Sequence, residues 1–126
     1  MPLTKGATRM ANHPIVHVEF ATTDREASGK FYSELFGWNV QQFPEMQYAM
    51  FTAEGGPGGG FATVDGQMIN QGEVSVYVGT DDIDASLAKA NELGGKTVVP
   101  KTEIPGYGNF AFFLDPSGTK VGLFSM

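Results

Sequence analysis

The chain has no cysteine and no long apolar run, and it has few basic residues. Without thiols, the protein cannot form disulfides, bind metals through thiolates or use a cysteine nucleophile. The 8 Lys and Arg residues are outnumbered by 14 Asp and Glu, which gives a formal net charge of -6 at pH 7. An acidic chain without a basic cluster is a poor match for nucleic acid or an anionic membrane surface.

Targeting segments are also missing. No apolar stretch approaches the roughly 20 residues that cross a bilayer, and the opening "MPLTKGATRMAN" lacks the apolar centre of a signal peptide. We therefore expect a cytoplasmic protein with neither a nucleic-acid nor a membrane partner. Residues 1–13 are expected to form a leader before one domain over residues 14–126, because 41% hydrophobic content in 126 residues suits a single core.

The first patterned stretch, "IVHVEFATTD", alternates in the manner of a β-strand. Val18 and Phe20 are expected to pack under a helix, while His17 and Glu19 point to the other side of the sheet. Polar side chains on an inner sheet face are costly unless they are hydrogen-bonded or hydrated, so this pair indicates a solvated cavity.

A helix is predicted next, between the capping residue Asp24 and the glycine stop at Gly37. Ala27, Phe31 and Leu35 recur every four residues and are expected to form its apolar face. Three short strand candidates follow, "WNVQQF", "QYAMFTA" and "GFATV", separated by proline and glycine signals.

The second half of the chain repeats this order. Placing Ala27-Ser28 on Ala85-Ser86 aligns a strand, a capping aspartate (Asp24 with Asp82), a helix and a glycine stop without a gap. Three more strand candidates then follow, "KTVVPKTEIP", "NFAFFLDP" and "TKVGLFSM". The sequence therefore predicts two strand–helix–strand–strand–strand modules, over about residues 14–66 and 72–126.

The glycine run "AEGGPGGGF" raises the question of a phosphate-binding loop. It lacks the lysine and hydroxyl residue that such a loop requires, and it does not lead into a helix. The repeat aligns it with the turn "DPSGTK" of the second module, so we interpret it as a hairpin connection.

The two modules together resemble the vicinal oxygen chelate superfamily, which has the glyoxalase and bleomycin-resistance fold. The segments that carry the resemblance are "VHVEFATTDREASGKFYSELFGW" and "FFLDPSGTKVGLF". The resemblance implies an α+β fold in which two tandem βαβββ modules form a cup-shaped mixed sheet, with helices outside and a ligand cavity inside. It also implies a homodimer. A ferredoxin-like α+β domain is the alternative, and it would contain fewer strands.

Members of this superfamily with metal chemistry hold one divalent cation between the modules, typically with a His on each first strand and a Glu or Gln on each last strand. His17 is the only residue here that matches such a ligand position. Ser75 stands at the equivalent position of the second module, and Gly122 and either Phe61 or Thr63 stand on the last strands. We therefore expect no cofactor and no standard metal site.

The predicted site contains His17 and Glu19 as candidate catalytic groups, the carboxylate acting as a base or fixing the tautomer of the imidazole. A hydrogen-bonded wall histidine and a hydrated carboxylate are equally open interpretations. Tyr48, like the other aromatic residues, is interpreted as core or pocket wall. The predicted ligand-binding residues are Phe61, Thr63, Ser75, Tyr77, Tyr107 and Phe124.

Three functions remain open at this stage. The sequence favours a protein that binds a small organic ligand in the cup, with a cationic or hydrogen-bond-donating ligand preferred if Glu19 is ionised. The second is a metal-independent enzyme that uses His17 and Glu19. The third is a metal-dependent lyase, isomerase or dioxygenase of the glyoxalase kind with altered ligands, although the glyoxalase reaction itself is not expected.

Overall fold

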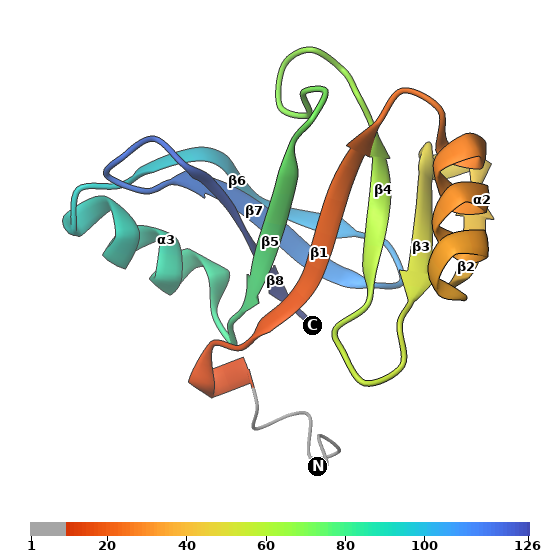
Figure 1. Cartoon of the computed structure of the whole chain (residues 1–126). Helices are drawn as coiled ribbons and strands as arrows, with labels where there is room; N and C mark the ends of the chain where they lie inside the picture. Colours follow the sequence, from red (N-terminus) through yellow and green to blue (C-terminus); the bar gives the residue numbers. More distant parts are fainter. Residues whose placement is uncertain (1–9) are drawn as a thin grey trace. The chain divides into compact units, whose positions relative to one another are not determined.

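The computed structural model describes residues 10–126, which contain eight strands, two α-helices and two short 3-10 turns (Figure 1). In chain order they are η1 (Met10–Asn12), β1 (Ile15–Thr22), α2 (Arg25–Phe36), β2 (Asn39–Phe43), η2 (Pro44–Met46), β3 (Tyr48–Thr52), β4 (Gly59–Thr63), β5 (Val74–Gly79), α3 (Ile83–Glu92), β6 (Lys96–Ile104), β7 (Gly108–Leu114) and β8 (Lys120–Ser125). Eight strands are more than the ferredoxin-like alternative contains, so that alternative is wrong. Neither described helix is long and apolar enough to cross a membrane.

The chain divides into two compact units that are described separately below. The first unit is His17–Ser75, and the second comprises the residues up to Val16 together with Val76–Met126. The divisions fall within β1 and β5, so the N-terminal residues belong with the second unit. The main-chain N–H of Gly79, for example, donates to the carbonyl of Pro14 over 2.7 Å. Part of the predicted leader, residues 1–9, lies outside the described residues.

Both units have the same strand order. In the first, β2 and β3 pair antiparallel, β3 and β4 pair antiparallel, and β4 pairs parallel with β1. In the second, β6, β7 and β8 are antiparallel and β8 pairs parallel with β5. The parallel pairs correspond residue by residue, since Glu19 lies opposite Gly60 and Tyr77 lies opposite Gly122. The predicted internal repeat and the α+β class are confirmed.

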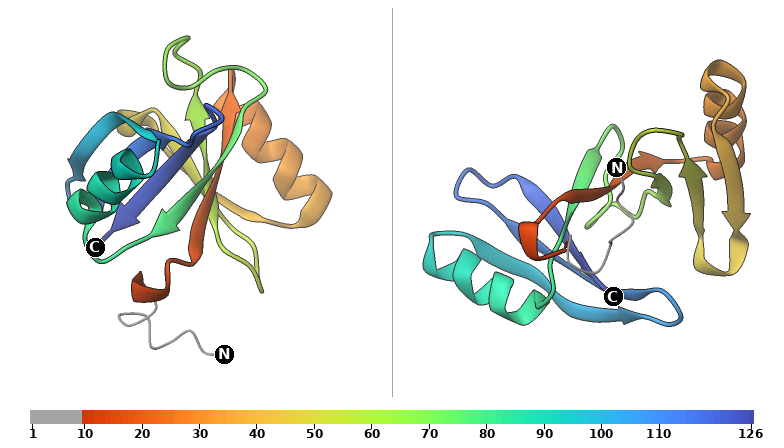
Figure 2. Two further views of the ribbon diagram at one scale, coloured as in Figure 1. Left: turned by 90° about the vertical axis from the view of Figure 1, so that its left-hand side faces the viewer. Right: turned by 90° about the horizontal axis from the view of Figure 1, so that it is seen from below.

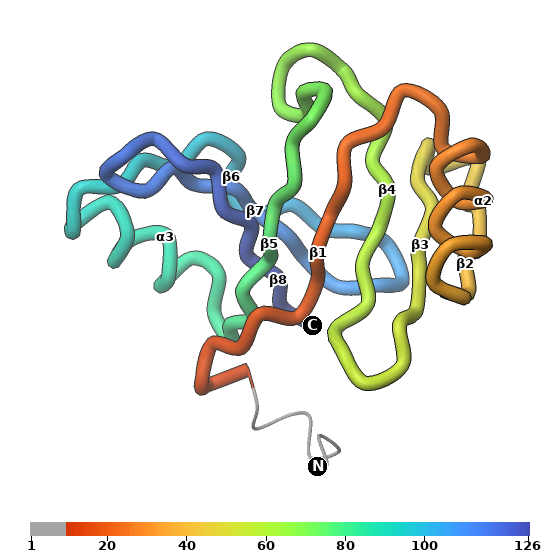
Figure 3. Tube along the Cα trace, viewed as in Figure 1, coloured from red at the N-terminus to blue at the C-terminus, as the bar shows by residue number. Residues whose placement is uncertain are grey.

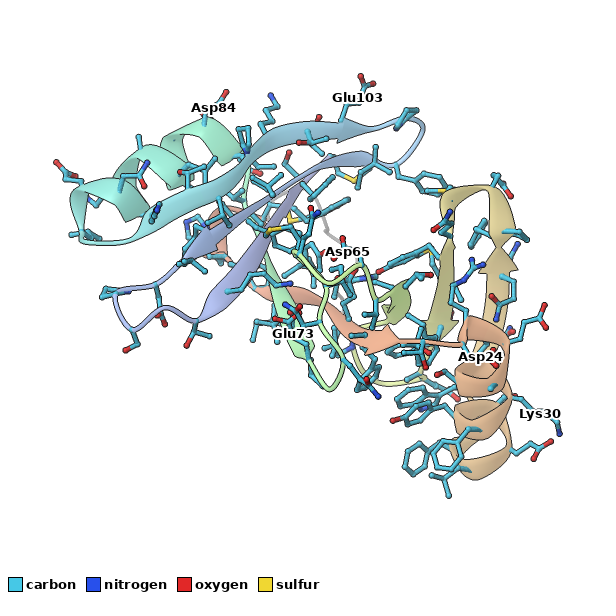
Figure 4. All side chains as sticks on the ribbon, turned by 90° about the horizontal axis from the view of Figure 1, so that it is seen from above. Asp24, Lys30, Asp65, Glu73, Asp84 and Glu103 are labelled. Atoms are coloured by element: carbon cyan, nitrogen blue, oxygen red, sulfur yellow. The ribbon has the colours of Figure 1, made fainter. Side chains whose placement is uncertain are left out.

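The two helices begin in the same way. Asp24 and Asp82 each accept a hydrogen bond of 3.0 Å from the backbone N–H three residues later, as predicted from their N-cap positions. Figure 4 shows Asp24 at the first turn of α2. Helix α2 stops at Gly37, which has the left-handed conformation (φ 76) that glycine adopts without strain.

Aromatic side chains fill the space between α2 and the sheet of the first unit. Phe61 is fully buried there, and its ring lies 5.7 Å from Phe20 and 5.5 Å from Tyr32. Phe31 and Leu35 were expected on the buried face, but they are 57% and 55% exposed. That prediction is wrong because the helix is rotated to present Gly29 and Tyr32 to the sheet, a shift that a four-residue apolar period does not reveal.

The second unit is packed with smaller side chains. Ile83 and Leu87 of α3 pack with Ala111 of β7 and Leu123 of β8, and Val78 and Phe113 border this cluster. Figure 2 shows α3 running alongside β6 in both of its views. Val78 of β5 lies on the helix side of the sheet, whereas Val74 at the start of the strand is 58% exposed.

The glycine run is the connection between β3 and β4, as the repeat predicted. Residues 53–58 leave β3, turn and enter β4, and the chain path is traced in Figure 3. Gly55 has a φ of 90° in this turn, which explains a glycine at that position. The segment leads into a strand and not into a helix.

Candidate functional site

Three polar side chains of the first unit form a hydrogen-bonded chain. Nε2 of His17 lies 2.7 Å from the hydroxyl oxygen of Tyr48, and that hydroxyl donates to Oε2 of Glu19 over 2.7 Å. His17 and Glu19 are two residues apart on β1, so both point to one face of the sheet. Phe20 packs toward α2, so this face is the one opposite α2.

Local backbone features bring Tyr48 to this face. Tyr48 begins β3 directly after Gln47, which has a left-handed conformation (φ 51) at the end of η2. Its ring then lies over Gly60 of β4, where a side-chain carbon would overlap the phenol. A glycine inside a strand often marks such a close approach. Gly60 also lies opposite Glu19 in the sheet, so the missing side chain opens the path between Tyr48 and the carboxylate.

The hydrogen bonds determine where the protons are. A tyrosine hydroxyl carries one proton, and Tyr48 donates it to Glu19. The hydroxyl oxygen must therefore accept from His17, which assigns the proton of the neutral imidazole to Nε2 and leaves its lone pair on Nδ1. The result is a directed chain of donors from His17 through Tyr48 to Glu19.

Burial controls the charge state of this chain. Glu19 is only 6% exposed, and a buried carboxylate is tolerated where hydrogen bonds compensate for its lost hydration. Burial also lowers the pKa of His17 from 6.5 to about 4. His17 is therefore neutral at pH 7, in agreement with its role as a single-proton donor to Tyr48.

These residues do not fit the four-ligand metal site of the superfamily. Among residues 10–126, no group of three or more His, Asp or Glu side chains is placed to hold a metal ion. Gly122, at the last-strand ligand position, has no side chain, and a Cβ there would overlap the ring of Tyr77. The equivalent position in the first unit is Gly60, which Tyr48 covers in the same way. Tyrosines thus lie over both glycines.

The structure brings together His17 and Glu19, as the sequence predicted, and adds Tyr48, which sequence reasoning assigned to the core or pocket wall. Two signals could have identified Tyr48. Tyr48 alternates with the buried Ala49 and Phe51, so its side chain lies on the other face of β3. The neighbouring strand β4 has a glycine, Gly60, where the Tyr48 ring contacts it.

Two predicted ligand-binding residues lie elsewhere. Phe61 is 0% exposed within the aromatic cluster under α2, so its predicted position at the ligand is wrong. Thr63 has the same strand parity as Phe61, and its hydroxyl donates to the backbone carbonyl of Gln47 over 3.1 Å. The last-strand position is Gly60, one residue before Phe61 and three before Thr63, and a shift by an odd number reverses the face of a strand.

The other predicted residues are placed as follows. Ser75 is 6% and Tyr77 8% exposed, both on β5, and the Tyr77 ring lies 5.5 Å from that of Phe112. Phe124 lies two residues after Gly122 on β8, so both are on the same face of the sheet. This is the face opposite α3, which also carries Tyr77. Tyr107 is 44% exposed in the turn between β6 and β7.

Comparison with known proteins gives consistent matches. Residues 14–53 match the family described as bleomycin resistance protein-like N-terminal. A glyoxylase-like domain-containing protein of Didymella fabae is 30% identical over 109 residues, which cover 80% of this chain and 84% of that protein. CFP32 of Mycobacterium tuberculosis, named as a glyoxylase, is 32% identical over 123 residues. These cover 84% of this chain but 43% of CFP32, so the chain spans less than half of that relative.

Solved structures show the same fold. A member of the glyoxalase/bleomycin resistance protein/dioxygenase superfamily from Vibrio splendidus superimposes with a TM-score of 0.66. The match covers 90% of this chain and 99% of that one, at 15% sequence identity. This likeness concerns the arrangement of helices and strands alone.

Proposed function

The chain belongs to the vicinal oxygen chelate superfamily, and we propose that it binds a small organic molecule on the sheet face that carries His17, Tyr48 and Glu19. We further propose that it does so without the standard divalent-metal site. The observation that supports both statements is the hydrogen-bonded chain, which uses the imidazole and the carboxylate as partners of a phenol.

The chemistry of this face indicates which ligands suit it. Nδ1 of His17 carries a lone pair, and the carboxylate of Glu19 accepts hydrogen bonds through both oxygens. Such a face favours a ligand that donates hydrogen bonds or carries positive charge over a strongly anionic one. Affinity for a strongly anionic ligand that survives high salt would contradict this preference.

The pKa of His17 favours binding over strong base catalysis. An effective general base has a pKa near the working pH. Burial holds the pKa of His17 at about 4, so the neutral ring is a weak base at pH 7. It is better suited to accept a hydrogen bond from a ligand than to remove a proton from carbon.

A metal-independent acid–base reaction is the second candidate, and the same hydrogen-bonded chain is the observation in its favour. Nδ1 of His17 would take a proton from the substrate while Nε2 gives its proton to Tyr48 and Tyr48 gives its own to Glu19. One proton then moves from substrate to carboxylate, and the neutral forms of His17 and Tyr48 are restored. A metal-dependent lyase or dioxygenase is the alternative that requires ligands other than those present.

We also propose a homodimer and a cytoplasmic location, as expected from the sequence. A homodimer is supported by three large apolar side chains at the surface of the first unit. Phe31, Leu35 and Phe36 are 57%, 55% and 59% exposed along α2. An apolar surface patch of this kind is typical of a contact with another chain.

A ligand screen by thermal unfolding tests the proposal. The protein is screened with small organic amines and hydrogen-bond donors in the presence of EDTA, because a ligand that binds the folded state raises the melting temperature. We expect at least one ligand whose stabilisation of the wild type is lost in His17→Gln. The matched control is Glu34→Gln, an exposed substitution on α2, on the opposite side of the sheet. Stabilisation that requires an added divalent cation would instead support the metal-dependent alternative.

A further inference from the structure

The second unit has a groove of about 690 Å³ beside α3. Its apolar part is formed by Ala90 of α3, Leu93 at the C-cap of that helix, Phe113 of β7 and Leu123 of β8. None of the residues that line this groove belongs to the hydrogen-bonded chain of His17, Tyr48 and Glu19. It is therefore separate from the site proposed above.

The internal repeat explains why this groove exists. In the first unit the corresponding space between helix and sheet is filled by aromatic rings, with Tyr32 lying 5.3 Å from Phe20 and 5.5 Å from Phe61. In the aligned repeat, Ala90 of the second unit replaces Tyr32 and Leu123 replaces Phe61. Leu87 stands in place of Gly29 and fills part of this space, but the aromatic rings are missing.

By the same alignment, Val78 stands in place of Phe20. One aromatic ring of the first unit does have an aromatic counterpart, which is Phe113. Phe113 corresponds to Phe51, which stacks on Trp38 at 4.3 Å in the first unit. The groove thus keeps one wall of an aromatic stack and lacks the ring that would lie against it. A planar ligand ring of similar size would restore that contact.

Charged groups at the groove are mostly acidic. Asp81, Asp82 and Asp115 line it, against the single Lys89 and the imidazole of His13. Asp82 and Asp115 are held in place, because their Oδ1 atoms accept backbone N–H groups at 3.0 Å or less. Each of these carboxylates has a second oxygen that can accept from a cation.

We propose that this groove is a second ligand site, which binds a small aromatic cation such as an arylalkylamine. The ring lies in the space of the missing Tyr32 counterpart, against Phe113, Ala90 and Leu123. The ammonium group lies toward the aspartates at the start of α3. Charge and shape together favour a cationic ring over its neutral or anionic analogue.

Three indole compounds test the charge preference. Binding of tryptamine, 3-methylindole and indole-3-acetate is measured by titration with detection of backbone amide shifts in nuclear magnetic resonance spectra. We expect tryptamine to bind most tightly and indole-3-acetate most weakly, with the largest shifts at Ala90 and Phe113. Equal or tighter binding of indole-3-acetate would overturn the proposal, as would tryptamine shifts confined to the face of His17.

Substitutions at two exposed aspartates test whether a carboxylate at the groove, and not only the negative charge of the whole protein, attracts the ammonium group. Asp81→Asn should weaken tryptamine binding by about threefold, in the range of a solvent-exposed ion pair, and leave 3-methylindole unchanged. Asp84→Asn is the matched control, because Asp84 is an acid of the same helix start that does not line the groove. Its carboxylate points outward from α3 in Figure 4. Equal effects of the two substitutions would overturn the assignment of the ammonium position.

Filling the groove tests the ring position. Ala90→Tyr restores the residue found at Tyr32 in the first unit and should reduce tryptamine affinity by more than about tenfold, while His17→Gln leaves it unchanged. Retention of wild-type affinity in a folded Ala90→Tyr protein would overturn the proposal. If this variant does not fold, the comparison of Asp81→Asn with Asp84→Asn still tests the proposal. Both positions are exposed, so both variants should fold.

Discussion

Two residues of the first unit, His17 and Tyr48, set the arrangement of protons at the candidate site. The bond from Nε2 of His17 to Tyr48 fixes the tautomer, and the bond from Tyr48 to Glu19 holds a buried carboxylate. Neither bond is local in sequence, since Tyr48 is 31 residues from His17. Sequence alternation identified His17 and Glu19, but it could not show which hydroxyl would join them.

Acid should destabilise the protein through His17. Its pKa is about 4 in the folded protein and 6.5 in the unfolded chain, so the unfolded state binds the proton more readily between these values. The free energy of unfolding should therefore fall as the pH is lowered from 6.5 toward 4, by up to about 3 kcal/mol. Above pH 6.5 this contribution is constant.

Urea unfolding at several pH values measures this effect, and His17→Gln provides the comparison because it cannot titrate. We expect the wild type to lose more stability than His17→Gln over that pH interval, with Asp and Glu residues contributing equally to both. Parallel pH profiles for the two proteins would show that burial does not shift the pKa of His17.

Removing the hydroxyl of Tyr48 should lower the free energy of unfolding more than removing the hydroxyl of Tyr32. Tyr48→Phe leaves the buried carboxylate of Glu19 and the imidazole without this partner, which costs about 1–3 kcal/mol. Tyr32→Phe is the matched control, because the Tyr32 ring contributes stacking within the aromatic cluster. Urea unfolding of both variants decides, and a larger loss for Tyr32→Phe would contradict the account of Tyr48.

Among the elements, the succession of strands and helices along the chain and the helix starts were predictable. Alternation and turn residues indicated every strand, and Asp24 and Asp82 showed where the helices begin. These features depend on local physics, which a sequence expresses directly. The buried side of α2 was not predictable, because Phe31 and Leu35 form an apolar row that the sheet does not cover.

The face of β4 also escaped prediction. The ligand position was placed at Phe61 or Thr63, while the sheet register identifies Gly60 as the counterpart of Gly122. The two connections have the same length by register, since Met50 lies opposite Gly60 and Phe112 lies opposite Gly122. The repeat alignment carried across the glycine run therefore points to Gly60, and the predicted ligand position did not follow it. Register is a property of the assembled sheet, and one residue reverses the side.

Gly60 should be intolerant of a side chain. Gly60→Ala places a carbon where the Tyr48 phenol lies, which must shift the ring or the strand and should cost about 1–3 kcal/mol. Gly56→Ala is the matched control in the preceding loop, where an added Cβ meets no atom within 4 Å. Thermal unfolding of the two variants tests this, and equal melting temperatures would contradict the close approach.

Across the described chain, the repeat gives one module architecture two different sets of side chains. The first unit fills the space under its helix with aromatic rings and carries polar chemistry on the opposite sheet face. The second unit keeps the same strand order but has smaller side chains under α3, which leaves the groove. Residue changes at equivalent positions account for the difference.

We propose that a phenol-bridged histidine and carboxylate take the place of the superfamily's metal site. It is tested most directly by thermal unfolding of EDTA-treated wild type and His17→Gln with added Mn²⁺, Ni²⁺, Zn²⁺ or Fe²⁺. A metal that binds the folded state specifically raises the melting temperature in a saturable way. We expect no saturable rise in melting temperature for either protein. A saturable rise in the wild type that disappears in His17→Gln would contradict it.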